Sequence, residues 1–124
     1  MTQTILVVDD NEANLRLINA VLKTRGYHLL EARSGEAALE ALAGSLPALV
    51  LMDVQMPGLS GIDVAREIRA MAEMAAVPLI AITAMAMKGD REAILAAGFN
   101  DYLAKPYKIG ELLALVARWL PAEG

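Results

Sequence analysis

The chain has 124 residues, of which 56% are hydrophobic and 21% charged, and its formal net charge is −4. This composition is too apolar for a disordered chain, and no uncharged run approaches the ~20 residues of a membrane span. The acidic balance disfavours direct nucleic-acid binding, and the absence of cysteine excludes disulfides and thiolate chemistry. The first ten residues lack a basic segment, so we expect no signal peptide and a cytoplasmic location.

Short runs of Val, Ile and Leu alternate along the chain with longer segments of helical period. The apolar runs predict strands over residues 4–8, 27–32, 48–52, 79–82 and 102–104. Helices are expected around residues 17–22, 34–43, 60–71, 88–97 and 108–120. Ser34 and Ser60 are the expected N-caps, and Gly26, Gly44 and Gly98 the expected helix stops. Five strand–helix repeats predict one α/β domain over residues 1–124, with a parallel sheet and helices on both faces.

Polar residues follow four of the five predicted strands. They are Asp9 and Asp10 after the first strand, Asp53 after the third, Thr83 after the fourth and Lys105 after the fifth. The carboxyl ends of parallel strands share one edge of a sheet, where open α/β folds bind their ligands. We therefore expect these side chains to meet in one shallow cleft.

The residue types in this cleft indicate phosphoryl chemistry. Carboxylates at short range repel one another, and a hard divalent cation such as Mg²⁺ removes that conflict. The ammonium of Lys105 and the hydroxyl of Thr83 would suit phosphoryl oxygens. A carboxylate can itself be the nucleophile and form an aspartyl phosphate. The set predicts Mg²⁺-assisted phosphoryl transfer, in which the protein mainly positions groups and neutralises charge.

Four motifs, in order along nearly the whole chain, resemble those of CheY-like response-regulator receiver domains. They are Val7-Val8-Asp9-Asp10, Leu51-Met52-Asp53-Val54-Gln55-Met56-Pro57-Gly58 with Gly61, Thr83-Ala84, and Lys105-Pro106. The resemblance implies a flavodoxin-like, doubly wound (βα)5 fold with the strand order 2-1-3-4-5. Residues 83–90 are most similar to DivK-type single-domain regulators and to the receivers of hybrid histidine kinases.

The resemblance also implies a metal and acceptor site. Asp53 would accept the phosphoryl group. Mg²⁺ would be held by Asp53, by Asp10 directly, by Asp9 partly through water, and by the backbone carbonyl of Gln55.

A second set of roles concerns the response to phosphorylation. Lys105 would pair with the phosphoryl group, and its peptide bond to Pro106 would be cis. Thr83 would move toward the phosphoryl group, which the small Ala84 leaves accessible, and Tyr102 would then turn inward. This population shift would reach a protein-binding face formed by the fourth helix, the fifth strand and the fifth helix.

These inferences predict a phosphoacceptor of a two-component or phosphorelay system. It would take a phosphoryl group from a phosphohistidine on a histidine kinase or histidine phosphotransfer protein. We do not expect an enzyme, since the domain would be a signalling phosphoacceptor that catalyses only its own phosphotransfer and autodephosphorylation. Its output would be the binding of another protein, with no direct contact to nucleic acid or membrane.

Plainer interpretations of the same residues stay open. Asp9 and Asp10 could cap the first helix, Thr83 could be an ordinary strand end, and Lys105 a solvated surface residue. Tyr102 could be simple packing at the sheet edge. Leu15 could contact a partner's helix bundle or only close the core.

Other functions also stay open. The chain could be part of a hybrid kinase, although Met1 and the short tail favour a complete single-domain regulator. A haloacid-dehalogenase-type phosphatase would place its nucleophile in an Asp-x-Asp after the first strand, whereas these acids are adjacent. A nucleotide- or flavin-binding module would need a glycine-rich loop there, which the acidic segment does not supply. A scaffold without phosphorylation is disfavoured by the intact set of Asp10, Asp53 and Lys105.

Overall fold

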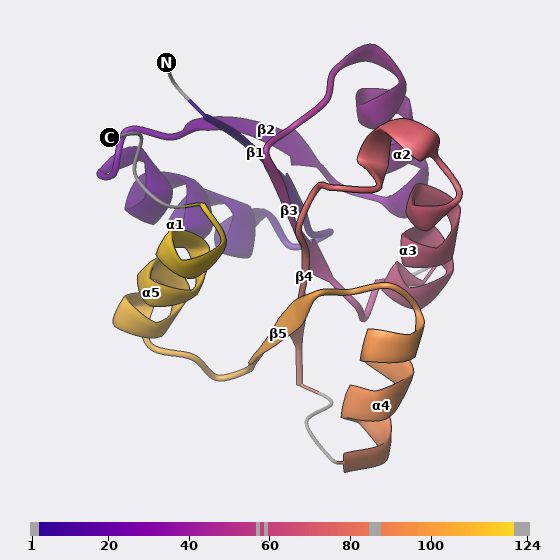
Figure 1. Ribbon diagram of the computed structural model, residues 1–124. Coiled ribbons are helices and arrows are strands. Elements are labelled where there is room, and N and C mark those ends of the chain that lie inside the picture. Colours follow the sequence, from indigo (N-terminus) through magenta and orange to yellow (C-terminus); the bar gives the residue numbers. More distant parts are fainter. Residues whose placement is uncertain (1–2, 57, 59, 85–87, 121–124) are drawn as a thin grey trace.

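The computed structural model describes residues 3–56, 58, 60–84 and 88–120. Within these residues, five strands form one sheet (Figure 1). The strands are β1 (Thr4–Val8), β2 (His28–Ala32), β3 (Leu49–Asp53), β4 (Leu79–Thr83) and β5 (Asp101–Ala104). All neighbouring pairs are parallel, and the order is β2-β1-β3-β4-β5. The predicted α/β class and strand order are confirmed.

Helices cover both faces of the sheet (Figure 1). They are α1 (Glu12–Lys23), α2 (Gly35–Gly44), α3 (Gly61–Arg69), α4 (Lys88–Ala96) and α5 (Ile109–Trp119), with a short 3-10 turn, η1 (Ala72–Met74). Helices α1 and α5 pack on one face, and α2, α3 and α4 on the other. Helix α3 ends two residues before the predicted bound, because Met71 has extended backbone and precedes η1.

Helix ends follow the predicted capping residues with two differences. Ser34 and Ser60 accept the backbone N–H of the third residue after each, as N-caps do. Helix α1, however, is capped by Asn11, so the interpretation of Asp9 and Asp10 as its cap is wrong. Gly44 is the last residue of α2 rather than the stop after it.

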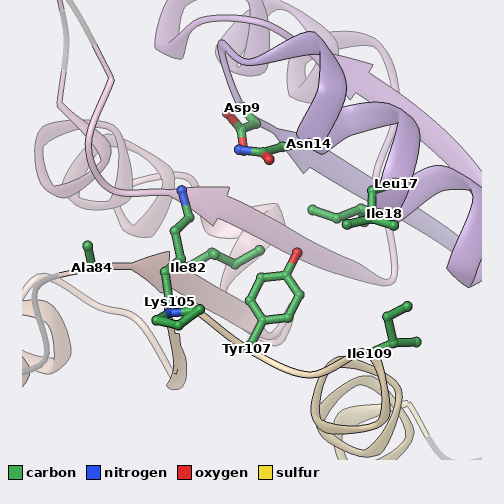
Figure 2. Close-up of a pocket in the computed structure, with 10 residues that line it drawn as sticks. Asp9, Asn14, Leu17, Ile18, Ile82, Ala84, Lys105, Tyr107 and Ile109 are labelled. Carbon is green, nitrogen blue, oxygen red and sulfur yellow. The ribbon is translucent and has the colours of Figure 1, made fainter.

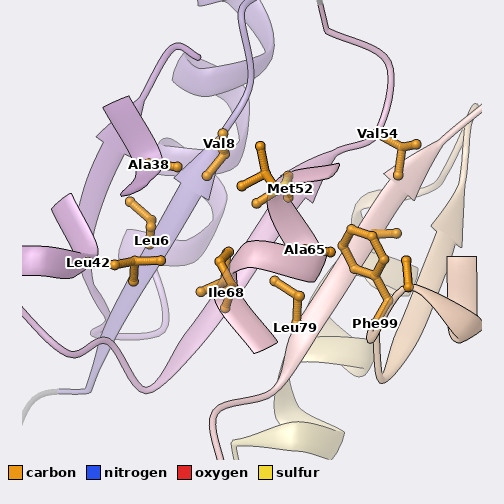
Figure 3. Close-up of a cluster of buried hydrophobic side chains, with 14 of the residues drawn as sticks. Leu6, Val8, Ala38, Leu42, Met52, Val54, Ala65, Ile68, Leu79 and Phe99 are labelled. Atoms are coloured by element: carbon orange, nitrogen blue, oxygen red, sulfur yellow. The ribbon is translucent and has the colours of Figure 1, made fainter. Parts of the chain in front are cut away.

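The strands separate the core into two clusters, one on each face of the sheet. Because successive strand side chains point to opposite faces, Leu6, Met52 and Leu79 join the cluster under α2, α3 and α4 (Figure 3). Their neighbours Ile5 and Leu51 join the cluster under α1 and α5. All residues of β3 and β4 are buried, which explains their continuous apolar sequence. Each fully buried Leu or Ile adds about 1.5–3 kcal/mol of hydrophobic stabilisation.

The amino edge of β4 and β5 is held together by Arg69, the last residue of α3. Its Nε donates to the carbonyl of Gly98 at 2.8 Å, and its Nη1 to the carbonyl of Met74 at 2.8 Å. Its Nη2 donates to Oδ1 of Asn100, which also accepts the N–H of Leu79 at 2.8 Å. Burial lowers the pKa of the Arg69 guanidinium. One side chain thus links α3, η1, β4 and the segment before β5.

Gly98 is required at this place for two reasons. Its φ is +114°, in the region that favours glycine. A Cβ there would clash with Cγ of Arg69.

The amino end of β5 is attached to α5. The indole Nε1 of Trp119 donates to Oδ2 of Asp101 at 3.0 Å, and Arg118 lies 3.8 Å from the same oxygen. These contacts fix the last turn of α5 against the first residue of β5. Within the described ranges, the helices are too short or too polar to cross a membrane.

Candidate phosphoryl-transfer site

Three polar side chains are buried among the described residues, and all three stand where central strands end. Asp9 follows β1 directly, and Asp53 and Thr83 are the last residues of β3 and β4. Their exposures are 2%, 4% and 0%. With the exposed Asp10, the carboxylates of Asp9 and Asp53 present oxygens that lie within 4.8 Å of one another. The structure therefore brings the three predicted acids together at the carboxyl edge of the sheet.

The electrostatics of this group favour a cation. Burial raises the pKa of Asp9, and the charge of Asp53 raises it further. The backbone N–H of Asn11, 2.9 Å from Oδ1 of Asp9, and the charge of Lys105 act in the opposite direction. A hard divalent cation would relieve both burial and repulsion, since Mg²⁺ prefers carboxylate oxygens. The cluster fits Mg²⁺.

Asp53 is held by partners on both of its oxygens. Nζ of Lys105 lies 3.0 Å from Oδ2, and the backbone N–H of Gln55 donates to Oδ1 at 2.8 Å. The side chain of Lys105 is 29% exposed and that of Asp53 5%, so the pair is open to solvent only on the lysine side. The peptide bond from Lys105 to Pro106 is cis.

The side chain of Gln55 makes a contact that the sequence did not reveal. Its Oε1 accepts the backbone N–H of Ala84 at 3.3 Å. The sequence implied a metal-binding role for the backbone carbonyl of Gln55, but no local pattern predicts a hydrogen bond between residues 29 positions apart. Pro57, in the same motif, lies outside the described residues.

A cavity of about 450 Å³ opens beside the acids, between α1 and the segment that leads from β5 to α5 (Figure 2). Asp9, Asn14 and Lys105 form its polar end. Its other end is apolar and includes Leu17, Ile18, Ile82, Tyr107 and Ile109. Burial, and then the charge of Asp9, raises the pKa of the Tyr107 hydroxyl, which Figure 2 shows directed toward α1.

Leu17, 45% exposed, lies at this cavity, whereas Leu15 is buried at 1% exposure. The alternative in which Leu15 closes the core is therefore the correct one. Leu17 is thus an exposed apolar residue of α1 beside the cavity.

Tyr102 lies on β5, three residues before Lys105, and is partly buried against the α2–α3–α4 side of the core. It pairs in register with Ala81, while Ala104 pairs with Thr83. Tyr102 and Thr83 therefore share one face of the sheet on adjacent strands. The guanidinium of Arg91 on α4 lies 5.5 Å from the centre of the Tyr102 ring, within cation–π range.

Comparison with known proteins assigns this arrangement to a family. Residues 5–117 match the family model of the response regulator receiver domain. The chain belongs to this family. The polar-differentiation response regulator DivK of Brucella ovis is 36% identical to this receiver domain, over 97% of this chain and 98% of that protein.

Solved structures agree in fold. The receiver domain of the sensor histidine kinase PA1611 from Pseudomonas aeruginosa PAO1 superposes with a TM-score of 0.89 at 42% identity, covering 98% of this chain and 100% of that one. That structure has a magnesium ion coordinated in its active-site cleft. The chemotaxis regulator CheY4 of Vibrio cholerae has a TM-score of 0.92 at 23% identity, covering 97% and 100%, and shares the fold.

Proposed function

We propose that this receiver domain accepts a phosphoryl group on Asp53 from a phosphohistidine of a histidine kinase or phosphotransfer protein. The observation that carries the proposal is the setting of the Asp53 carboxylate. It is 5% exposed, lies 3.0 Å from an ammonium, and stands in a cluster with the oxygens of Asp9 and Asp10. A carboxylate so placed is a nucleophile beside groups that neutralise phosphoryl charge.

In the transfer, a carboxylate oxygen of Asp53 attacks phosphorus. The P–O bond forms as the P–N bond to the imidazole breaks. The electron pair of the broken bond stays on the imidazole nitrogen, which takes a proton from solvent hydronium, so that the ring leaves as neutral histidine. Lys105 pairs with the phosphoryl oxygens as it pairs with Oδ2 of the free carboxylate. Mg²⁺, when bound by Asp9, Asp10, Asp53 and the backbone carbonyl of Gln55, supplies further positive charge at those oxygens.

The proposal includes reversal of the modification and an output. Water attack on the aspartyl phosphate regenerates the carboxylate, so the domain acts on itself rather than on a separate substrate. Phosphorylation adds about −1.5 to −2 charge and strong acceptor oxygens. Thr83 is drawn toward them, the small Ala84 leaves them accessible, and Tyr102 turns inward. The affected face of α4, β5 and α5 would bind a downstream protein, and it exposes Leu95 at 49%.

The experiment is incubation with acetyl phosphate and Mg²⁺, followed by intact mass, with Asp53→Asn as control. We expect one added phosphoryl group that requires Mg²⁺ and is absent in the variant. No gain in the wild type, together with no thermal shift on adding beryllofluoride, would indicate a constitutive binding module with the receiver fold. A cytoplasmic location and a single domain over residues 1–124 stay predictions.

A further inference from the structure

A hydrogen bond from the Ala84 N–H to Oε1 of Gln55 joins the segments that follow β4 and β3. Gln55 is two residues beyond Asp53, and its own N–H donates to Oδ1 of that carboxylate at 2.8 Å. Its side chain then reaches across to Ala84, the residue after β4, at 3.3 Å. Gln55 thus links the acceptor carboxylate to the end of the neighbouring strand.

Ala84 faces the same site as the acids. It borders the cavity together with Asp9 and Lys105, as Figure 2 shows. It also follows Thr83, whose side chain is completely buried. The backbone N–H of Ala84 is therefore a donor at the border of the site that holds Asp53, and Oε1 of Gln55 is its acceptor.

A phosphoryl group on Asp53 would compete for that donor. It brings three strong acceptor oxygens into a site whose backbone donor at Gln55 is already engaged by Oδ1 of Asp53. Hydrogen bonds to a charged oxygen are roughly twice as strong as those between neutral groups. The bond between Ala84 and the neutral amide of Gln55 is long and solvent-exposed, so it is the weaker competitor.

We propose that the Gln55 side chain is a placeholder for a phosphoryl oxygen. In the unmodified protein Oε1 occupies the Ala84 N–H, and on phosphorylation a phosphoryl oxygen displaces it. This role rests on the proposed function of Asp53 and assigns a positioning residue to it. Because the bond to Gln55 must break first, Gln55 weakens the binding of a phosphoryl group by the strength of that bond.

The test compares wild type with Gln55→Met and Gln55→Ala. Methionine keeps the length of the side chain and removes the amide oxygen, whereas alanine removes both. The affinity for beryllofluoride at saturating Mg²⁺ is measured by calorimetry. The Ala84 amide resonance is followed by NMR in the unmodified proteins.

We expect both variants to bind the mimic about two- to fivefold more tightly, the gain that one weak neutral hydrogen bond allows. The Ala84 amide proton should shift upfield in both.

Three results would overturn the placeholder role. Unchanged or weaker affinity in both variants would show that the bond does not oppose binding. A gain in Gln55→Ala alone would assign the effect to bulk rather than to the hydrogen bond. If wild type itself fails to bind beryllofluoride, the proposed function fails and the displacement fails with it. Wild-type binding therefore separates failure of the two ideas.

Discussion

The two edges of the sheet treat buried polar groups in opposite ways. At the carboxyl edge, carboxylate oxygens of Asp9, Asp10 and Asp53 lie within 4.8 Å of one another, and burial together with the charge of Asp53 raises the pKa of Asp9. At the amino edge, Arg69 meets two carbonyls and an amide oxygen, all neutral acceptors in hydrogen-bonding range. The carboxyl edge therefore has carboxylate repulsion that a bound cation would relieve, whereas the contacts of Arg69 at the amino edge involve no repulsion between like charges. The difference indicates that reactivity and stability are located at opposite ends of the same strands.

The largest expected effect tests the carboxyl edge. Lys105→Ala removes the ammonium beside Asp53, and phosphorylation by acetyl phosphate should slow by about 10²- to 10³-fold, the usual cost of losing one transition-state partner. The free energy of unfolding with Mg²⁺ present should change by about 1 kcal/mol or less, because the cation compensates the acids. Intact mass over time and urea unfolding measure the two effects. Lys23→Ala, an exposed lysine at the end of α1, is the charge-matched control. Phosphorylation of Lys105→Ala at the wild-type rate would contradict this assignment.

The reverse pattern is expected at the amino edge. Arg69→Met should lower the free energy of unfolding by about 2–3 kcal/mol, since several hydrogen bonds from one charged group are lost and their acceptors stay partly buried. The phosphorylation rate of the folded variant should be unchanged. Arg66→Met, on an exposed part of the same helix, should cost about 0.5 kcal/mol or less. If Arg69→Met were as stable as Arg66→Met, the claim that Arg69 stabilises the amino edge of the sheet would be wrong.

Asp9→Asn should stabilise the metal-free protein by a few degrees of melting temperature at pH 7. The pKa of Asp9 is raised in the folded state, so its stabilising protonated form is lost as pH rises through that value. At neutral pH the charge therefore costs stability, and asparagine removes that cost. The gain should disappear below the ordinary aspartate value of 3.8 and reverse on adding Mg²⁺, which the variant binds more weakly. Glu40→Gln, at an exposed position on α2, controls for the change in net charge. A lower melting temperature for Asp9→Asn than for wild type would show that the charge of Asp9 does not destabilise the metal-free protein.

The smallest effect concerns the path from the carboxyl edge to the α4–β5–α5 face. Arg91→Ala removes a cation–π contact worth about 0.5–1 kcal/mol at an exposed site. The ratio of inward to outward orientations of the Tyr102 ring should therefore change by about two- to fivefold. Ring resonances of Tyr102, with and without beryllofluoride, report this change. Arg91→Lys keeps the positive charge and should lie between wild type and alanine. Identical Tyr102 spectra in all three proteins would remove Arg91 from the path.

Rules about strand ends account for what the sequence could predict. Asp9, Asp53, Thr83 and Lys105 each follow an apolar run, and parallel pairing alone brings such residues to one edge. Helix caps at Ser34 and Ser60 were equally local signals. These patterns need no knowledge of how side chains meet across the core.

What escaped prediction depends on contacts between distant side chains. Arg69 and Asn100 are 31 residues apart, and nothing near either one in sequence marks the other. The bond from Gln55 to Ala84 spans two loops in the same way. On α1, choosing between Leu15 and Leu17 required the helix rotation, because two residues along a helix face different sides. The missed features are thus properties of packing rather than of local pattern.

The bond between Trp119 and Asp101 gives the protein an intrinsic optical probe. Trp119 is the single tryptophan of the chain, and it is bonded to Asp101, the first residue of β5. Lys105 directly follows the other end of β5. Four residues of strand separate the two ends by about 13 Å. Light emitted by this indole therefore originates too far from Asp53 for direct contact with a bound ion or phosphoryl group. A change in its emission during signalling would read out movement of β5 against α5, without any attached dye.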